Sequence, residues 1–159
     1  MTTPSTTPRR TVAGTPSTTP AGIDPRGPRF AAAVTTVVLA LALLTGNVWV
    51  LAVQVAVFAI GTLAGARATP YGFAFRRLIR PRLAPPAELE DPRPPRFAQA
   101  VGLLVTGVGL VLALAAVPAA VGVCAALALV AAFLNAAFGL CLGCELYLLI
   151  IRLRAPHPA

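Results

Sequence analysis

Charge is scarce in this sequence, and lysine is absent altogether. Only 11% of the 159 residues are charged and 57% are hydrophobic, whereas about a quarter of the residues in a soluble domain are charged. The long uncharged stretches therefore exclude an ordinary soluble domain and indicate a membrane protein. All 13 basic residues are Arg, which together with the heavy use of Ala, Val, Gly and Pro is typical of a GC-rich bacterial genome.

Motifs for catalysis and for cofactor binding are also missing. The sequence has no P-loop, no HExxH motif and no paired catalytic carboxylates. It has one histidine, His157 in the C-terminal tail, and one Cys-x-x-Cys pair, whereas a structural zinc site of this type has two such pairs. We therefore expect no bound cofactor and no metal site within one chain. The net charge is +8, but the sequence has no basic patch interleaved with aromatic residues of the kind that binds nucleic acids. We therefore expect no nucleic-acid partner.

Four apolar segments are the main feature that is present. They cover residues 30–45, 47–65, 97–117 and 118–140. A helix rises about 1.5 Å per residue, so a hydrocarbon core about 30 Å thick needs about 20 residues. Because backbone polar groups in lipid must bond within their own segment, we expect an all-α membrane fold of four transmembrane helices in residues 23–154. Tight turns at 45–47 and 117–118 predict two antiparallel helical hairpins.

An internal repeat relates the two expected hairpins. The sequence Asp-Pro-Arg-Gly-Pro-Arg-Phe-Ala at 24–31 returns at 91–98 with seven of its eight positions identical. Each copy precedes two apolar segments, so both copies enter the membrane in the same direction, which predicts a parallel repeat. A looser Gly-x-x-x-Gly match at 61–65 and 139–143 ends the second and fourth segments. Apolar and basic side chains mix at helical spacing in 71–80, which predicts a short interfacial helix after the second span.

The positions of the arginines predict how the protein lies in the membrane. All 13 occur in the N-terminal region, between the second and third segments, or at the C-terminal end, and neither hairpin turn is charged. Four spans place these three regions on one side, so the positive-inside rule assigns both termini to the cytoplasmic face of a bacterial inner membrane. Residues 1–22, rich in Thr, Pro and Ser, are predicted to be a disordered cytoplasmic tail, and 155–159 a short second tail.

Cys141, Cys144 and the neighbouring Glu145 form the candidate catalytic site. Residues i and i+3 of a helix face the same way, so the two thiols are expected to be close. A straight helix from Pro118 at the outer turn reaches Cys141 after about 35 Å, which places the pair at the cytoplasmic boundary. That compartment is reducing, so a redox or metal-binding pair is favoured over a structural disulfide. A helix that began near Gly143 would lower the pKa of a nearby thiol.

Each of these residues also has a simpler interpretation. A cysteine in a membrane helix is often only a small apolar side chain, which we expect for Cys124 and which is the alternative for the pair. Glu145 either accepts a thiol proton or positions a partner, or it is a charge at headgroup level or at a helix start. Gln54 and Asn135 lie within apolar segments, and we expect them to hydrogen-bond between helices.

Four stretches of the chain resemble a known family. They are Asp-Pro-Arg-Gly-Pro-Arg-Phe at 24–30, Thr-Pro-Tyr-Gly at 69–72, the Arg-rich segment 76–82, and Phe-Gly-Leu-Cys-Leu-Gly-Cys-Glu-Leu-Tyr at 138–147. Together they resemble an uncharacterised bacterial integral-membrane family, domain of unknown function 4395, over residues 22–154. The resemblance implies an envelope of four helices and no established activity. It suggests thiol chemistry with thioredoxin-like or sulfur-transfer partners.

The leading functional hypothesis is a membrane thiol redox or sulfur-relay protein. Its thiol pair would cycle between dithiol and disulfide or persulfide and exchange with a soluble thioredoxin-like or sulfur-transfer protein. The alternatives are a transport or channel subunit for a small sulfur species or soft metal, and a non-catalytic membrane scaffold. The sequence leaves open which cysteine attacks, whether the protein is an enzyme, its oligomeric state, and whether residues 140–152 continue the fourth span or bend into the interface.

Overall fold

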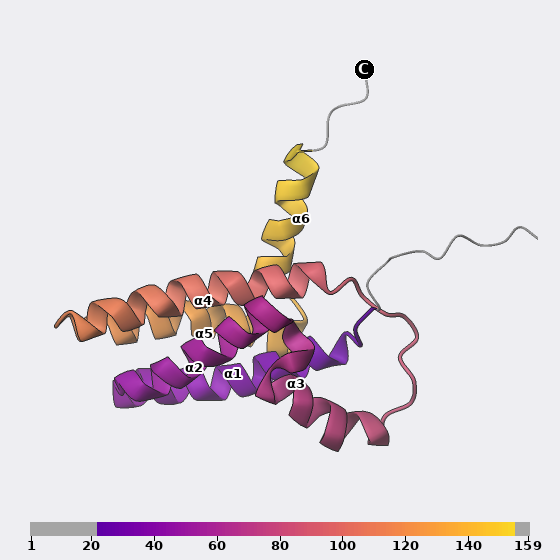
Figure 1. The fold of residues 1–159 in the computed structure, drawn as a ribbon, viewed down its shortest axis with the longest axis horizontal. Coiled ribbons are helices and arrows are strands. Elements are labelled where there is room, and N and C mark those ends of the chain that lie inside the picture. The colour runs from indigo at the N-terminus through magenta and orange to yellow at the C-terminus, as the bar shows by residue number, and fades with distance from the viewer. Residues whose placement is uncertain (1–21, 155–159) are drawn as a thin grey trace, which may run out of the picture.

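Residues 22–154, described by a computed structural model, form an all-α fold (Figure 1), which confirms the all-helical character predicted from the sequence. The helices are α1 (Arg26–Thr45), α2 (Val48–Ala64), α3 (Pro70–Ala74), α4 (Arg93–Leu114), α5 (Ala119–Phe138) and α6 (Leu142–Arg154). Shorter turns are the 3-10 helices η1 (Ala66–Ala68) and η3 (Arg80–Arg82) and the π-helix η2 (Phe75–Ile79). The two predicted tails, apart from residue 22, lie outside the described residues.

Four long helices, α1, α2, α4 and α5, form the body of the protein (Figure 1). The helix α1 packs mainly against α5, and α2 packs mainly against α4, while α4 and α5 also contact each other. Small and branched apolar side chains fill the space between them. The buried core consists of Leu39, Ala42, Leu51, Val121, Ala125 and Ala128. Each predicted hairpin therefore packs its first helix against the second helix of the other hairpin.

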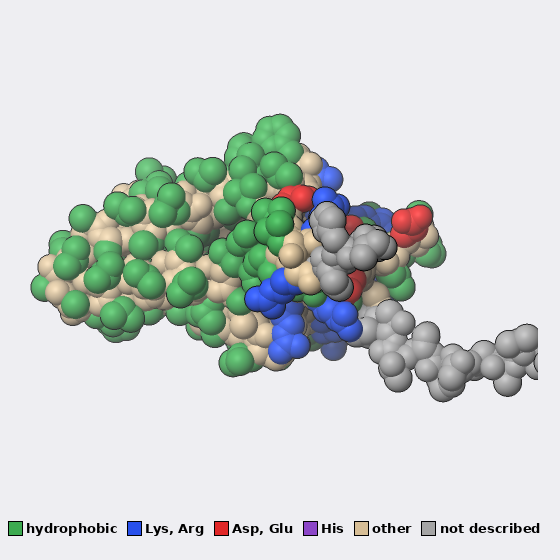
Figure 2. Space-filling model, turned by 90° about the horizontal axis from the view of Figure 1, so that it is seen from above, with side chains coloured by type: hydrophobic (Ala, Val, Ile, Leu, Met, Phe, Trp, Pro, Cys, Tyr) green, Lys and Arg blue, Asp and Glu red, His purple; other side chains and the backbone are tan. Residues whose placement is uncertain are grey.

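The outer surface of this bundle is apolar. Leu44 is 84% exposed and Val37 is 69% exposed, and many other large apolar side chains also point outward. Figure 2 shows hydrophobic side chains along the bundle, and Arg, Asp and Glu side chains gathered at one end. The helices α1, α4 and α5 are long and apolar enough to cross a membrane, and α2 is a shorter apolar helix of 17 residues. This surface fits a membrane protein, because so much exposed apolar area is unfavourable in water.

The two copies of the repeated sequence start their helices in the same way. Asp24 accepts a hydrogen bond from the backbone N–H of Arg26 at 3.0 Å, and Asp91 accepts one from the backbone N–H of Arg93 at 2.9 Å. An aspartate in this position satisfies an N–H group that has no partner within the helix, and its charge favours the positive end of the helix. Local sequence thus specifies where α1 and α4 begin.

Each copy also places an arginine against the end of a distant helix. The guanidinium group of Arg29 donates to the backbone carbonyls of Ala136 and Ala137, near the end of α5, at 3.2 and 3.0 Å. That of Arg96 donates to two carbonyls near the end of α2, at 2.6 and 2.7 Å. The two helices then stop at glycines of positive φ, Gly65 at 88° and Gly139 at 72°, where a side chain would be strained. Gly65 and Gly139 thus each stand directly after the last residue of a long helix.

The segment after α2 folds back against the charged end of the bundle. Its Tyr71 hydroxyl donates to the side-chain oxygen of Gln54 at 2.9 Å, and the Gln54 nitrogen donates to the Thr35 hydroxyl at 3.5 Å. Gln54 is fully buried, so these bonds confirm for Gln54 the predicted hydrogen bonding between helices. In η2, the ring of Phe75 packs against that of Phe30 in α1, with centroids 5.8 Å apart. The predicted short helix after α2 is thus present and is held to the bundle by both polar and aromatic contacts.

Candidate functional site

The last helix leaves the bundle and does not prolong α5. The helix α5 ends at Phe138, Gly139 turns the backbone, and α6 begins at Leu142. Figure 1 shows α6 standing at a steep angle to α4 and α5. Residues 142–154 therefore form a separate helix, which decides against a continued fourth helix.

Cys141 and Cys144 lie at the start of α6. Cys141 immediately precedes the helix, and its carbonyl accepts the backbone N–H of Glu145 at 3.0 Å. Cys144 lies one turn further on, and its thiol donates to the sulfur of Cys141 with 2.6 Å between the sulfur atoms. Both are free thiols and are partly buried. The structure thus brings together the two thiols that the sequence placed three residues apart.

This arrangement changes the pKa values of the two thiols in opposite directions. The Cys144 thiol donates to the Cys141 sulfur and, with the backbone N–H groups of Cys144 and Gly143, lowers the pKa of Cys141 to about 7. Burial and the charge of Glu145 oppose this change. The same hydrogen bond, together with burial, raises the pKa of Cys144. Near neutral pH, Cys141 is therefore the thiol with the greater thiolate fraction and the better nucleophile.

Two contacts with α4 hold the thiol pair in place. Gly143, between the cysteines, lies so near α4 that a Cβ atom on it would be 2.6 Å from the Cα of Ala98. Further along α6, the ring of Tyr147 packs against that of Phe97 with centroids 5.6 Å apart. A larger residue at position 143 would push α6 away from α4. The geometry of the pair therefore depends on how α6 packs.

A cavity of about 260 Å³ lies beside Cys141. Its lining comes from the four long helices and the start of α6, and it is mainly apolar. The polar side chains that line it include Thr35, Gln99 and Asn135. Within residues 22–154, the buried Oε1 atom of Gln99 has no hydrogen-bond partner. Cys141 thus borders a partly open, mainly apolar cavity that offers a few hydrogen-bonding groups.

Glu145 is exposed, and it contributes its backbone N–H to the first turn of α6. A carboxylate in this turn is favoured by the positive end of the helix. Its charge raises the pKa of both thiols, against the hydrogen bonds that lower the pKa of Cys141 and in the same direction as the other effects on Cys144. The side chain therefore lies close enough to the pair to influence it electrostatically.

Comparison with known proteins identifies the family. The family described as Domain of unknown function (DUF4395) matches residues 23–152. The chain belongs to the DUF4395 family. This confirms the resemblance seen in the sequence, and the matched range contains both cysteines of the pair. No curated protein and no solved structure matched the chain.

The other side chains of this DUF4395 chain that could bind a metal do not form a metal site with the cysteine pair. Among residues 22–154, no group of three or more His, Cys, Asp or Glu side chains could hold a metal ion. Cys124 lies within α5, and a Cβ atom on Gly109 of α4 would be 2.5 Å from its Cβ. Cys124 therefore fills a close contact between α4 and α5, in agreement with its interpretation as a packing residue.

Two residues near the site were not singled out by the sequence for these roles. Arg29 was interpreted only as a charge that sets orientation, although its guanidinium carbon lies 3.9 Å from the position of a Cβ on Gly139. Gln99 was given no role, although it lines the cavity beside Cys141. The recurrence of Arg29 at the same place in the second copy was a usable signal. An amide near an apolar segment was a weaker signal, because such groups usually bond between helices.

Proposed function

We propose that this DUF4395 protein is a membrane thiol protein in which Cys141 and Cys144 cycle between dithiol and disulfide. The observation that carries the proposal is the contact of the two sulfur atoms at the start of α6, which lowers the pKa of Cys141. Reactive cysteines combine a lowered pKa with partial exposure and a neighbouring resolving thiol. Cys141 has each of these properties, so it is the attacking residue and Cys144 the resolving one.

The reaction is a thiol–disulfide exchange with a partner protein. The Cys141 thiolate attacks one sulfur of a partner disulfide, forms a mixed disulfide and releases the partner's other sulfur as a thiolate. Cys144 then loses its proton, for which Glu145 is the candidate acceptor, and attacks the sulfur of Cys141. The partner's second thiolate leaves and the Cys141–Cys144 disulfide remains. Two electrons have passed to the partner, and a reducing dithiol protein of the thioredoxin type restores the pair by the reverse exchange.

In this proposal the four long helices are transmembrane spans, and they form two hairpins of a parallel repeat. One support is the pairing of Ile23 with Glu90, which occupy equivalent places before the two copies and share two backbone hydrogen bonds of 2.9 Å. An approximate two-fold axis between the copies accounts for this pairing and for the equivalent contacts of the two arginines. With 17 residues, α2 is short for a span, which flanking residues or local thinning of the bilayer accommodate.

The charged end of the bundle faces the cytoplasm of a bacterial inner membrane in this proposal. The gathering of Arg side chains at that end (Figure 2) supports it, because positive charge is retained on the cytoplasmic side. The helix α6 then begins at the membrane boundary, and the thiol pair lies in a reducing compartment. A soluble thioredoxin-like or sulfur-transfer protein reaches it there.

Thiol labelling in oriented vesicles tests both reactivity and orientation. A membrane-impermeant maleimide should label Cys141 in inverted vesicles after reduction, and oxidation of the vesicles should block that labelling. The matched control is the variant Cys141→Ser/Cys144→Ser, which retains Cys124 within α5 and should not be labelled. Absence of labelling in reduced inverted vesicles would contradict the proposal. Labelling only in right-side-out vesicles would preserve the redox role but reverse the orientation.

The cavity favours a second candidate, a carrier of a small sulfur species. The Cys141 thiolate would take the outer sulfur of a small persulfide, form a Cys141 persulfide and release the donor as a thiolate. An apolar lining suits an uncharged species better than an ion. Gln54, whose side chain already bonds to neighbouring helices, offers no ion path.

Mass spectrometry separates this candidate from the others. Incubation with a persulfide donor should add one sulfur atom to Cys141 if the protein is a carrier, and should give only the Cys141–Cys144 disulfide if it is a redox protein. If the protein is a non-catalytic scaffold, Cys141 should gain sulfur no faster than the packing residue Cys124 does, and the Cys141–Cys144 disulfide should not form. Replacing both cysteines of the pair by Ser would then change only the stability.

A further inference from the structure

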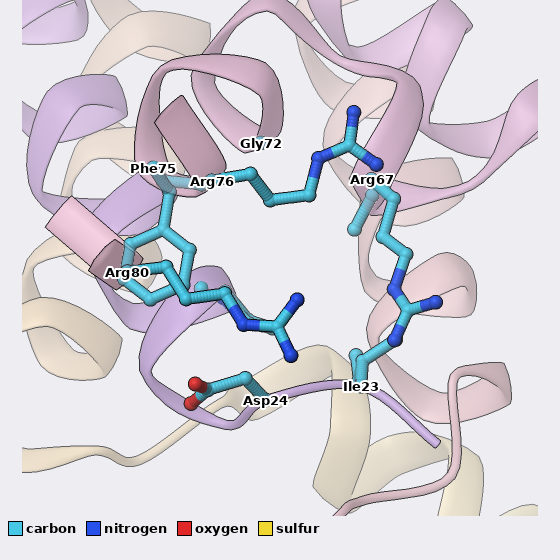
Figure 3. A pocket seen from close by; sticks show the side chains of 11 residues that line it. Ile23, Asp24, Arg67, Gly72, Phe75, Arg76 and Arg80 are labelled. Atoms are coloured by element: carbon cyan, nitrogen blue, oxygen red, sulfur yellow. The ribbon is translucent and has the colours of Figure 1, made fainter. Parts of the chain in front are cut away.

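A second, smaller cavity lies at the charged end of the bundle. Its volume is about 40 Å³, and its lining includes the first turn of α1 together with η1 and the residues that follow α3. Figure 3 shows the guanidinium groups of Arg67, Arg76 and Arg80 around one opening, with the carboxylate of Asp24 beside Arg80. Three positive side chains from separate turns of the chain thus converge on one small space.

These positive charges are largely unneutralised within residues 22–154. Arg67 donates one N–H to a backbone carbonyl, and Arg76 and Arg80 have no ion pair in this part of the chain. The nearest carboxylate, Asp24, is already paired with Arg26 at 3.1 Å. Guanidinium groups held around one opening repel each other, so an anion between them is stabilised.

Asp24 offers a second and opposite recognition group. Asp24 is only 8% exposed, and one of its carboxylate oxygens, Oδ1, accepts hydrogen bonds from Arg26. The other oxygen, Oδ2, is buried without a hydrogen-bond partner among the described residues. A buried carboxylate oxygen is normally satisfied, so a hydrogen-bond donor is missing at this position. A ligand that fits the whole cavity therefore carries an anionic group for the arginines and a hydroxyl or ammonium group for Asp24.

We propose that this cavity binds a phosphate group, carried by a lipid headgroup or by a soluble phosphate compound. The planar fork of arginine matches the oxygens of phosphate in two parallel hydrogen bonds. A cavity of about 40 Å³ exceeds the roughly 10–15 Å³ that one water molecule needs, so it admits a small anionic group. The arginines that line the cavity belong to the charged end of the bundle, which lies at headgroup level in the proposed membrane orientation. This binding is independent of the thiol reaction.

The test measures phosphate-group binding by the full chain and by variants with matched charge. The variant Arg76→Gln/Arg80→Gln removes two arginines that line the cavity. The control Arg77→Gln/Arg82→Gln removes two charges from the same segment that do not line it; Arg77 lies over the Phe73 ring and Arg82 bonds to a backbone carbonyl. For the lipid, each protein is placed in nanodiscs of phosphatidylcholine that also contain phosphatidylethanolamine. Native mass spectrometry of the released protein then counts the lipid molecules that stay bound to it. Titration calorimetry in detergent measures inorganic phosphate.

We expect the cavity variant to retain about tenfold less of the bound probe and the control to stay within about twofold of the native protein. Retained lipid without binding of inorganic phosphate identifies a headgroup site, and the reverse identifies a soluble phosphate site; both outcomes support the shared chemistry. Equal losses in the two variants, or binding of neither probe by the native protein, would overturn the proposal.

Two further variants keep the test decisive if the double glutamine variant does not fold. Arg76→Lys/Arg80→Lys keeps the charge but removes the planar forks, so it should fold and lose part of the binding. Asp24→Asn keeps an oxygen for Arg26 and replaces the unpaired oxygen by an amide N–H. This variant is tested with two lipids, because phosphatidylethanolamine has an ammonium donor for Asp24 that phosphatidylcholine lacks. The native protein should therefore prefer phosphatidylethanolamine, and Asp24→Asn should lose that preference; an unchanged preference would count against the role of Asp24.

Discussion

Gly143 and Ala98 are in direct contact where α6 crosses α4. A Cβ atom on Gly143 would lie 2.6 Å from both the Cα and the Cβ of Ala98, a distance at which one of the two helices must move. Because Gly143 separates the two cysteines, the contact couples the geometry of the thiol pair to the packing of α6 on α4. Substitution of this glycine tests that coupling.

Gly143→Ala should lower stability and slow disulfide formation. Displacement of a packed helix by one added methyl group costs about 1–3 kcal/mol, and the displaced start of α6 holds the sulfur atoms less closely. The measurements are chemical unfolding in detergent and the rate of disulfide formation with a thiol oxidant. Gly107→Ala is the matched control, because a Cβ there meets no atom within 4 Å. An equal loss in both variants would show that the contact with Ala98 is unimportant.

Alkylation of Cys141 should depend on pH with a midpoint near 7. The thiolate is the reactive form, so the rate rises as pH increases through the pKa of Cys141, which is lowered to about 7. Cys144, whose pKa is raised, should remain unmodified over the same range. Peptide mass spectrometry after short pulses of iodoacetamide at each pH measures both rates.

Cys144→Ala should move the alkylation midpoint of Cys141 upward. The variant removes the largest cause of the lowered pKa, the hydrogen bond from the Cys144 thiol, so less thiolate is present at neutral pH. The midpoint should shift toward the ordinary range of a cysteine thiol. A midpoint that stays near 7 would assign the lowered pKa to the backbone of α6 alone.

Arg29→Gln and Arg96→Gln should have similar effects on stability and different effects on the thiols. Each variant removes two hydrogen bonds to carbonyls at the end of a distant helix, and these bonds are exposed, so we expect a loss of about 1 kcal/mol in each case. Only Arg29 contacts the end of α5 that leads into Cys141. Arg29→Gln should therefore also change the alkylation rate of Cys141, and Arg96→Gln should leave it unchanged. Equal effects on that rate would indicate a general loosening of the bundle.

Tyr71→Phe should destabilise the protein by about 1–3 kcal/mol, because it leaves a buried amide oxygen without its donor. The Tyr71 hydroxyl donates to Gln54, which is fully buried. The measurement is the midpoint of thermal unfolding in detergent. Tyr147→Phe is the control, because Tyr147 contacts Phe97 through its ring and no hydrogen bond of its hydroxyl occurs within residues 22–154. Comparable losses would mean that the bond to Gln54 contributes little.

The turns between the long helices were predictable because local chemistry specifies them, whereas the segments expected from residues 30 and 97 begin four residues after the starts of α1 and α4. Asp24 and Asp91 mark helix starts two residues later. At the first hairpin turn, Gly46 adopts φ of 61° and Asn47 accepts the N–H of Trp49 at 2.9 Å, as expected for a glycine that ends one helix and an asparagine that begins the next. These residues act within a few positions of themselves, so their pattern is visible in the sequence.

The end of α5 was harder to predict because apolarity continues past it. Hydropathy does not distinguish the last turn of α5 from the first turn of α6, and residues 140–151 are almost entirely apolar. The break occurs at Gly139, and α6 then follows a direction set by its contacts with α4. The Gly-x-x-x-Gly pattern at 61–65 and 139–143 likewise does not show that α2 and α5 each stop directly before a glycine, Gly65 and Gly139.

By itself, the sequence determined the all-α class, the apolar helices and the gathering of charge in a few regions, because these properties depend on local composition and periodicity. It also identified the thiol pair. The tertiary structure decided which helices pair, where α6 points and which of the two thiols has the lower pKa. The helix pairing and the direction of α6 depend on contacts between residues far apart in the chain, such as Arg29 with the end of α5 and Gly143 with Ala98. The pKa difference depends on the break after α5, which places both cysteines at the start of a separate helix.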